Sequence, residues 1–539
     1  MNADRPMTTD KSMNTAKPTT TDKPTTTDKR LPAAAIGAVA LSAALFYLST
    51  GLTPVPWLIW LAPLPVLLIA PRVGKRAAFS LAGVAWLGGE SALWRYFVST
   101  VGIPVAVAVL IVVGSALLFG LVVLLVRALM RQGRLLLATV VFPAAWVTVE
   151  LVMSHAAPFG AWWSLAYTQA GVLPVLQLVS ATGVWGVTFL VLLVPAAAAA
   201  LVVPQARGQV QARWRRWRPA VAATAALVVV VGYGVARLHS SHAPSSAHVA
   251  LLASDRAIDP TPVDSAAGRD LLNAYLGGVQ ALAGQDLRVI VLPEKVFVAD
   301  DTSLPGLTGP LARLAQKQHS DIVVGLILNR GNESFNAAID LPAAGGAPVT
   351  YFKRHLVTGV ESDLTAGDSR AYLSARQDQW AIAVCFDLDF PSLVRDYRSH
   401  GATTLFVPAW DFSDDAWLHS RMAVTRGVEN GMTVVRAARQ GALTVSDPYG
   451  RVIAEARTSG PSMVSVTAAL PSGAASTLYT RFGDWFAWSC VVLLFVGLGV
   501  AYSGRNAAKQ PGATQKPGAA KKPGAETTQT TTTTQTTEH

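Results

Sequence analysis

Charged residues are scarce in this chain of 539 residues. Asp, Glu, Lys and Arg together make up 14% of it, against about 25% in ordinary globular proteins. The apolar types AVILMFWYC reach 51%. This composition excludes a disordered protein, a collagen and a purely soluble protein, because so few charges cannot cover a water-facing surface. It predicts an integral membrane protein that also carries a water-facing domain.

Cysteine is almost absent as well. The two cysteines, Cys385 and Cys490, lie far apart in the sequence. Cys490 falls within an apolar run, whereas Cys385 falls in a region of mixed polarity. Neither a disulfide framework nor a structural zinc site is expected from such a pair.

The net charge of +11 is explained by where the basic residues lie. A surplus of Lys and Arg is often typical of nucleic-acid binding. Here these residues gather between long apolar runs, as insertion into a membrane requires. No nucleic-acid partner is therefore expected.

Eight apolar stretches approach the roughly 20 residues that a helix needs to cross a bilayer. The second of them is short and contains proline. The expected spans are 33–50, 56–71, 77–94, 101–126, 135–153, 176–203, 219–236 and 484–502.

Basic residues are distributed unequally between the two sides of these eight spans. If the N-terminus is cytoplasmic, the short outer loops contain one basic residue, Arg95. The positive-inside rule then places residues 237–483 outside the cytoplasm. The three loops and the C-terminal tail on the cytoplasmic side carry sixteen basic residues: Arg72, Lys75, Arg76, Arg127, Arg131, Arg134, Arg207, Arg213, Arg215, Arg216, Arg218, Arg505, Lys509, Lys516, Lys521 and Lys522.

The composition also predicts the domain boundaries. Both ends of the chain are of low complexity, with PTTTDK repeated within 18–29, and cannot bury enough surface to fold. The expected organisation is a disordered cytoplasmic tail (1–30), a membrane domain of seven helices (31–236), an extracytoplasmic domain (237–483), a last transmembrane helix (484–502) and a disordered basic cytoplasmic tail (503–539).

Residues 237–483 differ in character from the membrane region. Short β-rich runs alternate with helical patterns, which is typical of a layered α/β domain. The expected strands are 248–254, 287–293, 321–328, 380–386, 402–408 and 442–447, and the expected helices are 266–284, 307–318, 391–399 and 415–430.

Three reactive residues lie at or near the ends of β-rich runs in this domain: Glu294 in VLPEKVF, Lys353 in YFKRHLV and Cys385 in IAVCFDLDFP. Each alone has a purely structural explanation: a solvated carboxylate, a surface lysine and a small buried hydrophobic residue. As a set they have a chemical use. A carboxylate can take the proton of a thiol, and an ammonium group can stabilise the oxyanion that forms after attack.

These motifs resemble the Glu-Lys-Cys triad of the nitrilase (carbon–nitrogen hydrolase) superfamily, which implies an αββα sandwich. Eight spans with such a domain before the last one resemble one family within it, the apolipoprotein N-acyltransferases, over residues 30–502. The resemblance implies that Cys385 is the nucleophile, Glu294 its base and Lys353 the oxyanion's cation.

The resemblance also implies the reaction. Cys385 would take a fatty acyl chain from a membrane phospholipid as a thioester and pass it to the N-terminal amine of a diacylglyceryl apolipoprotein. No cofactor and no metal would be needed. The protein would be a monomer that crosses the bacterial inner membrane several times, with its catalytic domain on the extracytoplasmic side.

Supporting residues follow from the same comparison. Glu361 stands eight residues after Lys353, at the family's spacing, and would orient Lys353 or line the pocket. Asp387 would support the site beside the nucleophile. The chain departs from the family's pattern in three places: Phe386-Asp387 replaces Tyr-Glu, no Gly-Glu pair precedes Glu361, and PAWDF around Trp410 replaces an Asn-Asp pair before the aromatic residue.

Three tryptophans are candidates for substrate entry. Trp162 and Trp163, in PFGAWWSLAY, fit either an interfacial aromatic belt or the lining of an acyl-chain entrance. Trp410 belongs to a stretch that resembles the family's aromatic loop.

Two other functions remain open from the sequence. A membrane-tethered nitrilase-type amidase would use the same triad with water as the second nucleophile, although one anchor would suffice for it. A transporter or binding scaffold would be expected to place several charges inside its spans, and here Glu90 and Glu150 are the main ones.

Overall fold

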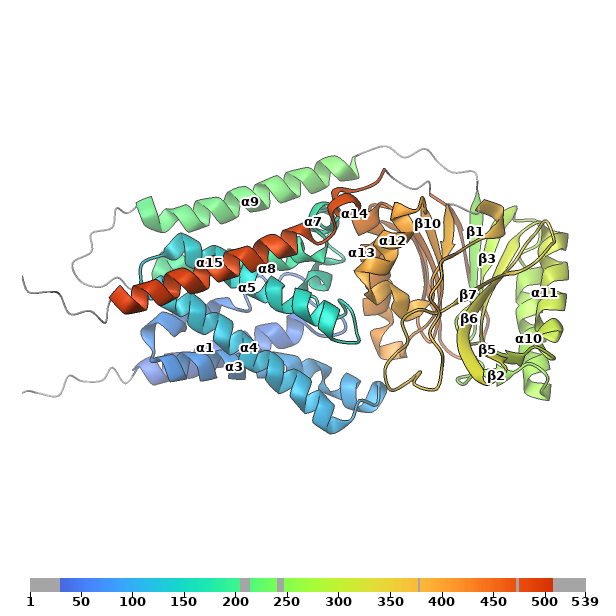
Figure 1. Ribbon diagram of the computed structural model, residues 1–539, viewed down its shortest axis with the longest axis horizontal. Helices are drawn as coiled ribbons and strands as arrows, with labels where there is room; N and C mark the ends of the chain where they lie inside the picture. Colours follow the sequence, from blue (N-terminus) through green and yellow to red (C-terminus); the bar gives the residue numbers. More distant parts are fainter. Residues whose placement is uncertain (1–29, 204–213, 240–246, 377–378, 472–474, 508–539) are drawn as a thin grey trace, which may run out of the picture.

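The computed structural model describes residues 30–203, 214–239, 247–376, 379–471 and 475–507. It has a helical part and an α/β domain joined end to end (Figure 1). Helix α1 begins and α15 ends at the far end of the helical part. Of the two expected tails, 1–29 and 508–539 lie outside the described residues, while Arg30 and 503–507 belong to these two helices.

The helical part contains the apolar runs of the sequence. Among the described residues, six helices are long and apolar enough to cross a membrane: α1, α4, α5, α8, α9 and α15. The helices outside the α/β domain are α1 (Arg30–Ser49), α2 (Leu64–Ile69), α3 (Lys75–Glu90), α4 (Val105–Arg131), α5 (Leu135–Ala156), α6 (Leu173–Leu176), α7 (Val179–Thr182), α8 (Val184–Val202), α9 (Trp214–Leu238), α14 (Leu478–Phe482) and α15 (Trp485–Ala507).

Among the described residues, six of the eight expected spans therefore contain a helix of that length. The second expected span, 56–71, forms turns and the six-residue helix α2, because its prolines remove backbone donors and clash with a preceding turn. The third forms α3, which ends after 16 residues at Glu90. The sixth expected span begins its long helix only at Val184, after Gly183, whose φ of 67° interrupts the helix.

The α/β domain is an αββα sandwich, which confirms the predicted fold class. One sheet has the order β14-β1-β3-β5-β4-β2, and in it β6 also pairs with β5, and β7 with β6. The other sheet has the order β13-β12-β11-β10-β9-β8. Helices α10 and α11 cover the outer face of the first sheet, and α12 and α13 lie between the second sheet and the helical part (Figure 1).

The four helices of this domain are α10 (Ala266–Gln280), α11 (Leu304–Gln318), α12 (Pro391–Ser399) and α13 (Ala416–Asn430). The strands are β1 (His248–Ala253), β2 (Thr261–Pro262), β3 (Leu287–Val291), β4 (Phe297–Asp300), β5 (Asp321–Arg330), β6 (Glu333–Leu341), β7 (Val349–Phe352), β8 (Ala371–Tyr372), β9 (Trp380–Ile382), β10 (Thr404–Trp410), β11 (Thr433–Arg439), β12 (Ala442–Ser446), β13 (Val452–Arg457) and β14 (Val464–Ala469).

Successive side chains of the central strands belong to two different hydrophobic cores, one on each face of the first sheet. In β3, Val289 and Val291 face the second sheet, while Ile290 packs with the residues under α10 and α11. Because successive side chains of a strand point to opposite faces, both faces of the first sheet are buried. The loops at the strand ends are left to carry polar groups.

Helix α13 joins the α/β domain to the helical part. Its Leu418, Met422 and Val428 belong to the same hydrophobic core as the membrane helices. Its Glu429 accepts a hydrogen bond of 2.9 Å from the backbone N–H of Val184, at the start of α8. The α/β domain is therefore fixed to the end of the helical bundle through α13.

Candidate active site

Glu294 lies in a break between two strands. β3 pairs with the first half of β5 and β4 with its second half, so the chain leaves the sheet between them. The N–H of Leu292 bonds Val323 before the break, and that of Val296 bonds Gly325 after it. A Cβ on Gly325 would come within 2.6 Å of the Glu294 Cα, so only glycine lets β5 pass under this loop.

Lys353 directly follows β7 and is completely buried. Its backbone N–H bonds the carbonyl of Asn336 at 2.8 Å. Its Nζ lies 2.9 Å from Oε1 of Glu294 and 2.8 Å from Oε2 of Glu361. Burial alone would lower the pKa of Lys353, but these two carboxylates raise it well above its ordinary value. The side chain is therefore a permanent cation.

Glu361 accepts hydrogen bonds at both carboxylate oxygens. Oε1 accepts from Lys295 Nζ and from Asn336 Nδ2, both at 2.7 Å. Oε2 accepts from Lys353 Nζ and from the Val357 N–H at 2.9 Å. Burial would raise the pKa of Glu361, but the two ammonium groups lower it to about 2. Glu361 therefore stays ionised and cannot act as a base near neutral pH.

Cys385 does not end a strand, contrary to the sequence prediction. It begins the short turn Cys385–Asp389, three residues after β9, with a left-handed φ of 44°. Its Sγ lies 3.5 Å from the carbonyl oxygen of Trp410, at the end of the parallel strand β10. Burial, followed by the charge of Glu294, raises the pKa of the thiol well above its usual range. The resting thiol is therefore protonated and needs a base.

The carboxylate of Asp387 holds this turn in place through hydrogen bonds. Its Oδ2 accepts hydrogen bonds from the Val384 N–H at 3.0 Å and from the Tyr351 hydroxyl at 2.7 Å. Its Oδ1 accepts from the His355 N–H at 2.9 Å. The carboxylate thus fixes the loop after β7 against the loop after β9, and it does not line the cavity at Cys385.

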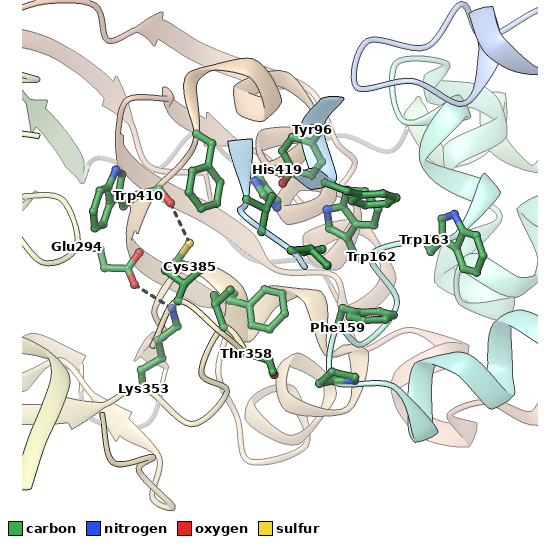
Figure 2. Close-up of a pocket in the computed structure, with 18 of the residues that line it drawn as sticks. Tyr96, Phe159, Trp162, Trp163, Glu294, Lys353, Thr358, Cys385, Trp410 and His419 are labelled. Carbon is green, nitrogen blue, oxygen red and sulfur yellow. Dashed lines mark hydrogen bonds and ion pairs between the residues drawn. The ribbon is translucent and has the colours of Figure 1, made fainter. Parts of the chain in front are cut away.

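Glu294, Lys353 and Cys385 meet at one cavity (Figure 2). It encloses about 1080 Å³ of empty space, open solvent at its mouth included. The helical part contributes nine of the twenty lining residues: Tyr96, Phe97, Val101, Ile103, Ile111, Pro158, Phe159, Trp162 and Trp163. The α/β domain contributes the polar groups and further apolar ones: Glu294, Lys295, Lys353, Val357, Thr358, Val360, Cys385, Phe386, Trp410, Phe412 and His419.

The loop after α5 docks directly on the turn that holds Cys385. The Ala161 N–H donates a 2.8 Å hydrogen bond to the carbonyl of Asp389. Gly160 has a φ of 53°, and a Cβ there would meet the same carbonyl oxygen at 2.4 Å. Trp162 from this loop stacks on Tyr96 with ring centroids 5.7 Å apart. The apolar wall of the cavity is thus attached to the turn that holds Cys385.

The three tryptophans predicted at the entrance all line this cavity. Trp162 lies between Cys385 and the helices in Figure 2, whereas Trp163 lies farther away, against the helices. Trp410 contributes its carbonyl next to Cys385, and its indole N–H bonds Gln440 at 2.6 Å.

Sequence reasoning missed Lys295, Asn336 and Tyr96. Asn336 donates to Glu294 Oε1 at 2.5 Å as well as to Glu361, and it belongs to strand β6, which was not predicted. Lys295 was visible as the second charge of VLPEKVF, but nothing in the sequence indicates that its partner is Glu361.

A second charged cluster lies beside the cavity, formed by Asp411, Asp415 and His419. Both oxygens of Asp411 bond the guanidinium of Arg436, at 2.8 and 2.5 Å. Asp415 accepts from the Tyr96 hydroxyl at 2.5 Å. Because these carboxylates already bind donors from the protein, the donor set does not fit a metal ion.

Two family models match the chain. One, described as the apolipoprotein N-acyltransferase N-terminal domain, matches residues 42–197, and the other, described as carbon-nitrogen hydrolase, matches residues 264–475. The apolipoprotein N-acyltransferase of Geobacter metallireducens is 27% identical to the chain in an alignment of 513 residues that covers 87% of this chain and 94% of that protein. Over most of its length the chain is therefore similar to apolipoprotein N-acyltransferases.

Other apolipoprotein N-acyltransferases are similar too. That of Bradyrhizobium diazoefficiens is 26% identical over 68% of this chain and 74% of its own. Among solved structures, an amidase from Nesterenkonia sp. is 20% identical with a TM-score of 0.36, over 42% of this chain and 92% of its own. Nit3 of Saccharomyces cerevisiae, from the nitrilase superfamily, is 18% identical with a TM-score of 0.35, over 42% and 92%.

Proposed function

We propose that this protein is a phospholipid:apolipoprotein N-acyltransferase that works through a thioester on Cys385. Its relatives carry the name apolipoprotein N-acyltransferase, and this protein is a membrane acyltransferase of lipoprotein maturation. The phospholipid donor, the order of the steps and the role of each residue are the parts that we propose.

In the first half-reaction, Glu294 takes the thiol proton and the sulfur attacks the sn-1 ester carbonyl of a phospholipid. Lys353 and a backbone N–H of the Cys385 turn stabilise the oxyanion. The intermediate then collapses, and the proton on Glu294 passes to the leaving alkoxide. A lysophospholipid departs, and the acyl chain remains on Cys385 as a thioester.

In the second half-reaction, the N-terminal amine of a diacylglyceryl apolipoprotein attacks the thioester. Glu294 takes a proton from the attacking amine, and the C–S bond breaks as the amide forms. The proton returns to the sulfur, which regenerates the thiol. The side chains supply all the acid–base chemistry of this cycle, so we propose that it uses no cofactor, and that one chain suffices.

One observation carries this proposal: the triad opens into a cavity whose other wall comes from the helical part. Half-buried Cys385 faces aromatic and aliphatic side chains such as Phe159 and Trp162. An apolar wall of this kind suits an acyl chain, and its position at the end of the bundle suits substrates that are anchored in a bilayer. A soluble amide would not require either feature.

The supporting residues have distinct proposed roles. Glu361 orients Lys353 through their 2.8 Å ion pair. Asp387 fixes the nucleophile turn through its bonds to Val384 and Tyr351. We propose that Trp162, Trp163 and Trp410 line the path of the acyl chain.

We propose that the α/β domain lies on the extracytoplasmic side of the bacterial inner membrane. A thiol-labelling map tests this location. In a cysteine-free variant, Asp300→Cys should react with a membrane-impermeant maleimide added to intact spheroplasts, and Arg131→Cys should react only after lysis. Both positions are exposed in the structure. Labelling in the opposite order would place the domain in the cytoplasm.

Mass spectrometry of the purified protein tests the chemistry. Incubation with phospholipid alone should add one fatty-acyl mass to the peptide that contains Cys385, and hydroxylamine should remove it. Addition of a diacylglyceryl lipopeptide should then discharge the adduct with formation of a triacylated product. A protein that never acylates and instead releases ammonia from a soluble amide would be an amidase.

A further inference from the structure

Lys295 is a second lysine inside the candidate active site. Its Nζ lies 2.7 Å from Oε1 of Glu361, and its side chain is 8% exposed. The ammonium group also lies 4.8 Å from the centroid of the Trp410 ring. Lys295 lines the same cavity as Cys385. Its left-handed φ of 49° is unfavourable for a lysine, and residues in such conformations gather at functional sites.

Glu361 forms an ion pair at each of its two carboxylate oxygens. Oε1 faces Lys295 and Oε2 faces Lys353. Lys353 in turn faces Glu294. Two carboxylates and two ammonium groups therefore form a quartet with no net charge. Without Lys295, two buried carboxylates would share one ammonium group, and the site would be negative before the thiol ionised.

We propose that Lys295 is a positioning residue for Cys385 chemistry: it neutralises Glu361, so that Lys353 can stabilise the charge that develops on the sulfur and on the substrate oxygen. This rests on the proposed role of Cys385 as the nucleophile. A negative charge added to a neutral quartet costs less than one added to a negative triad, because opposite charges stabilise and like charges destabilise an ionised form.

The other charged groups near the thiol do not replace Lys295. Arg436 of β11 faces Cys385, but its guanidinium bonds both oxygens of Asp411 after β10. His419 of α13 lines the cavity, and it is paired with Asp415 at 3.2 Å. Each of these two cations already has its own carboxylate. Arg439 of β11 also stacks on the Trp410 ring, 3.8 Å from its centroid, but its guanidinium bonds the carbonyls of Ala257 and Ile258. Lys295 is the cation that balances Glu361.

Trp410 connects the second lysine to the nucleophile. Its ring faces the ammonium group of Lys295, which is a cation–π arrangement. Its carbonyl oxygen lies 3.5 Å from the Cys385 sulfur. The residue that holds the thiol is thus in contact with the cation that neutralises Glu361.

The experiment measures the ionisation of Cys385 without any acyl substrate. The rate of alkylation by iodoacetamide is recorded against pH for the full-length protein in detergent. A Cys490→Ala background leaves Cys385 as the reacting thiol. Lys295→Met should move the midpoint of the profile up by about one pH unit, which slows alkylation about tenfold below it. Lys295→Gln, which keeps a hydrogen-bond donor, should shift it likewise, and Lys295→Arg should restore it.

The partner substitution gives a prediction of opposite sign. Glu361→Gln should move the midpoint down, because it leaves both lysines and removes a negative charge. The double variant Lys295→Met/Glu361→Gln should return close to the parent profile. A purely structural role for Lys295 would not produce this reciprocal rescue. The proposal is overturned if Lys295→Gln leaves the profile unchanged, or if both single substitutions shift it in the same direction.

This test and the test of the proposed function fail independently. Alkylation needs neither phospholipid nor lipoprotein. A protein whose profiles shift as described but that forms no thioester would contradict the acyl transfer and leave the role of Lys295 intact. A protein that forms the thioester with equal profiles in all variants would contradict only the role of Lys295.

Discussion

Gly160 offers a direct test of the contact between the loop after α5 and the turn that holds Cys385. Its φ of 53° is left-handed, and an added Cβ would lie 2.4 Å from the Asp389 carbonyl oxygen and 2.9 Å from its carbon. Both atoms are backbone, so no side-chain rotation can relieve the clash. In Gly160→Ala the loop must therefore move away from the Cys385 turn.

The cost of this change follows from two contributions. A left-handed conformation costs an alanine about 1–2 kcal/mol. Separation of the loop also breaks the hydrogen bond from the Ala161 N–H to Asp389, worth about 1 kcal/mol. Docking of the loop should thus weaken by about 2–3 kcal/mol, and since 1.36 kcal/mol is a factor of ten, its equilibrium constant should fall roughly 30- to 150-fold.

The assay compares two reactions of the same thiol. Thioester formation from phospholipid should fall in Gly160→Ala, by up to the calculated factor, because the aromatic wall that we propose for the acyl chain is displaced. Iodoacetamide alkylation of Cys385 should not become slower, because a small reagent needs no such wall. Gly171→Ala in the same outer loop is the matched control, since nothing lies within 4 Å of its added Cβ. Equal acylation by the two variants would refute the reasoning.

The large features of the fold were predictable because they depend on local pattern. All six predicted strands and all four predicted helices of the α/β domain are present, with shifted ends. The nearly continuous apolar run in LRVIVLP indicates burial of both faces of β3. Strands such as β6 and β13 were missed because they contain polar residues, such as Asn336 and Glu455, whose partners lie far away in the sequence.

Spans were harder to predict than strands because hydropathy does not report helix length. Residues 56–71 are as apolar as a span, yet their prolines allow only the short helix α2. The run 176–203 contains Gly183 in a left-handed conformation, which ends one helix and begins another. Composition identified the membrane part, but backbone chemistry decided which segments are long enough to cross.

The candidate site was predictable only where the chemistry is carried by residue type. A thiol, a carboxylate and an ammonium group at strand ends indicated the set of Glu294, Lys353 and Cys385. Contacts between distant segments were not predictable. Lys295 lies 66 residues from Glu361 in sequence, and the docking of Ala161 on Asp389 joins the two parts of the molecule. Both depend on tertiary packing that no local pattern encodes.

Three further predictions concern single side chains. Cys385→Ala should abolish acyl transfer while Cys490→Ala, in the apolar helix α15, should leave it largely intact, as measured by triacylated lipopeptide; activity in the first variant would end the mechanism. Lys353→Met should reduce the rate of thioester formation by about 10²–10³, the loss expected for one oxyanion donor, whereas the exposed Lys317→Met should not change it. The last prediction concerns pH: burial would lower the pKa of His419, but its facing carboxylates raise it to about 9, above the ordinary 6.5. Because the folded pKa is the higher one, this histidine stabilises the protein fully below about pH 6.5 and loses that contribution as pH rises through 9. Thermal unfolding in detergent should therefore show a loss on the order of 2 kcal/mol between pH 7 and 10, and His419→Gln should remove that part of the pH dependence; an unchanged profile in the variant would mean that His419 is neutral in the folded protein.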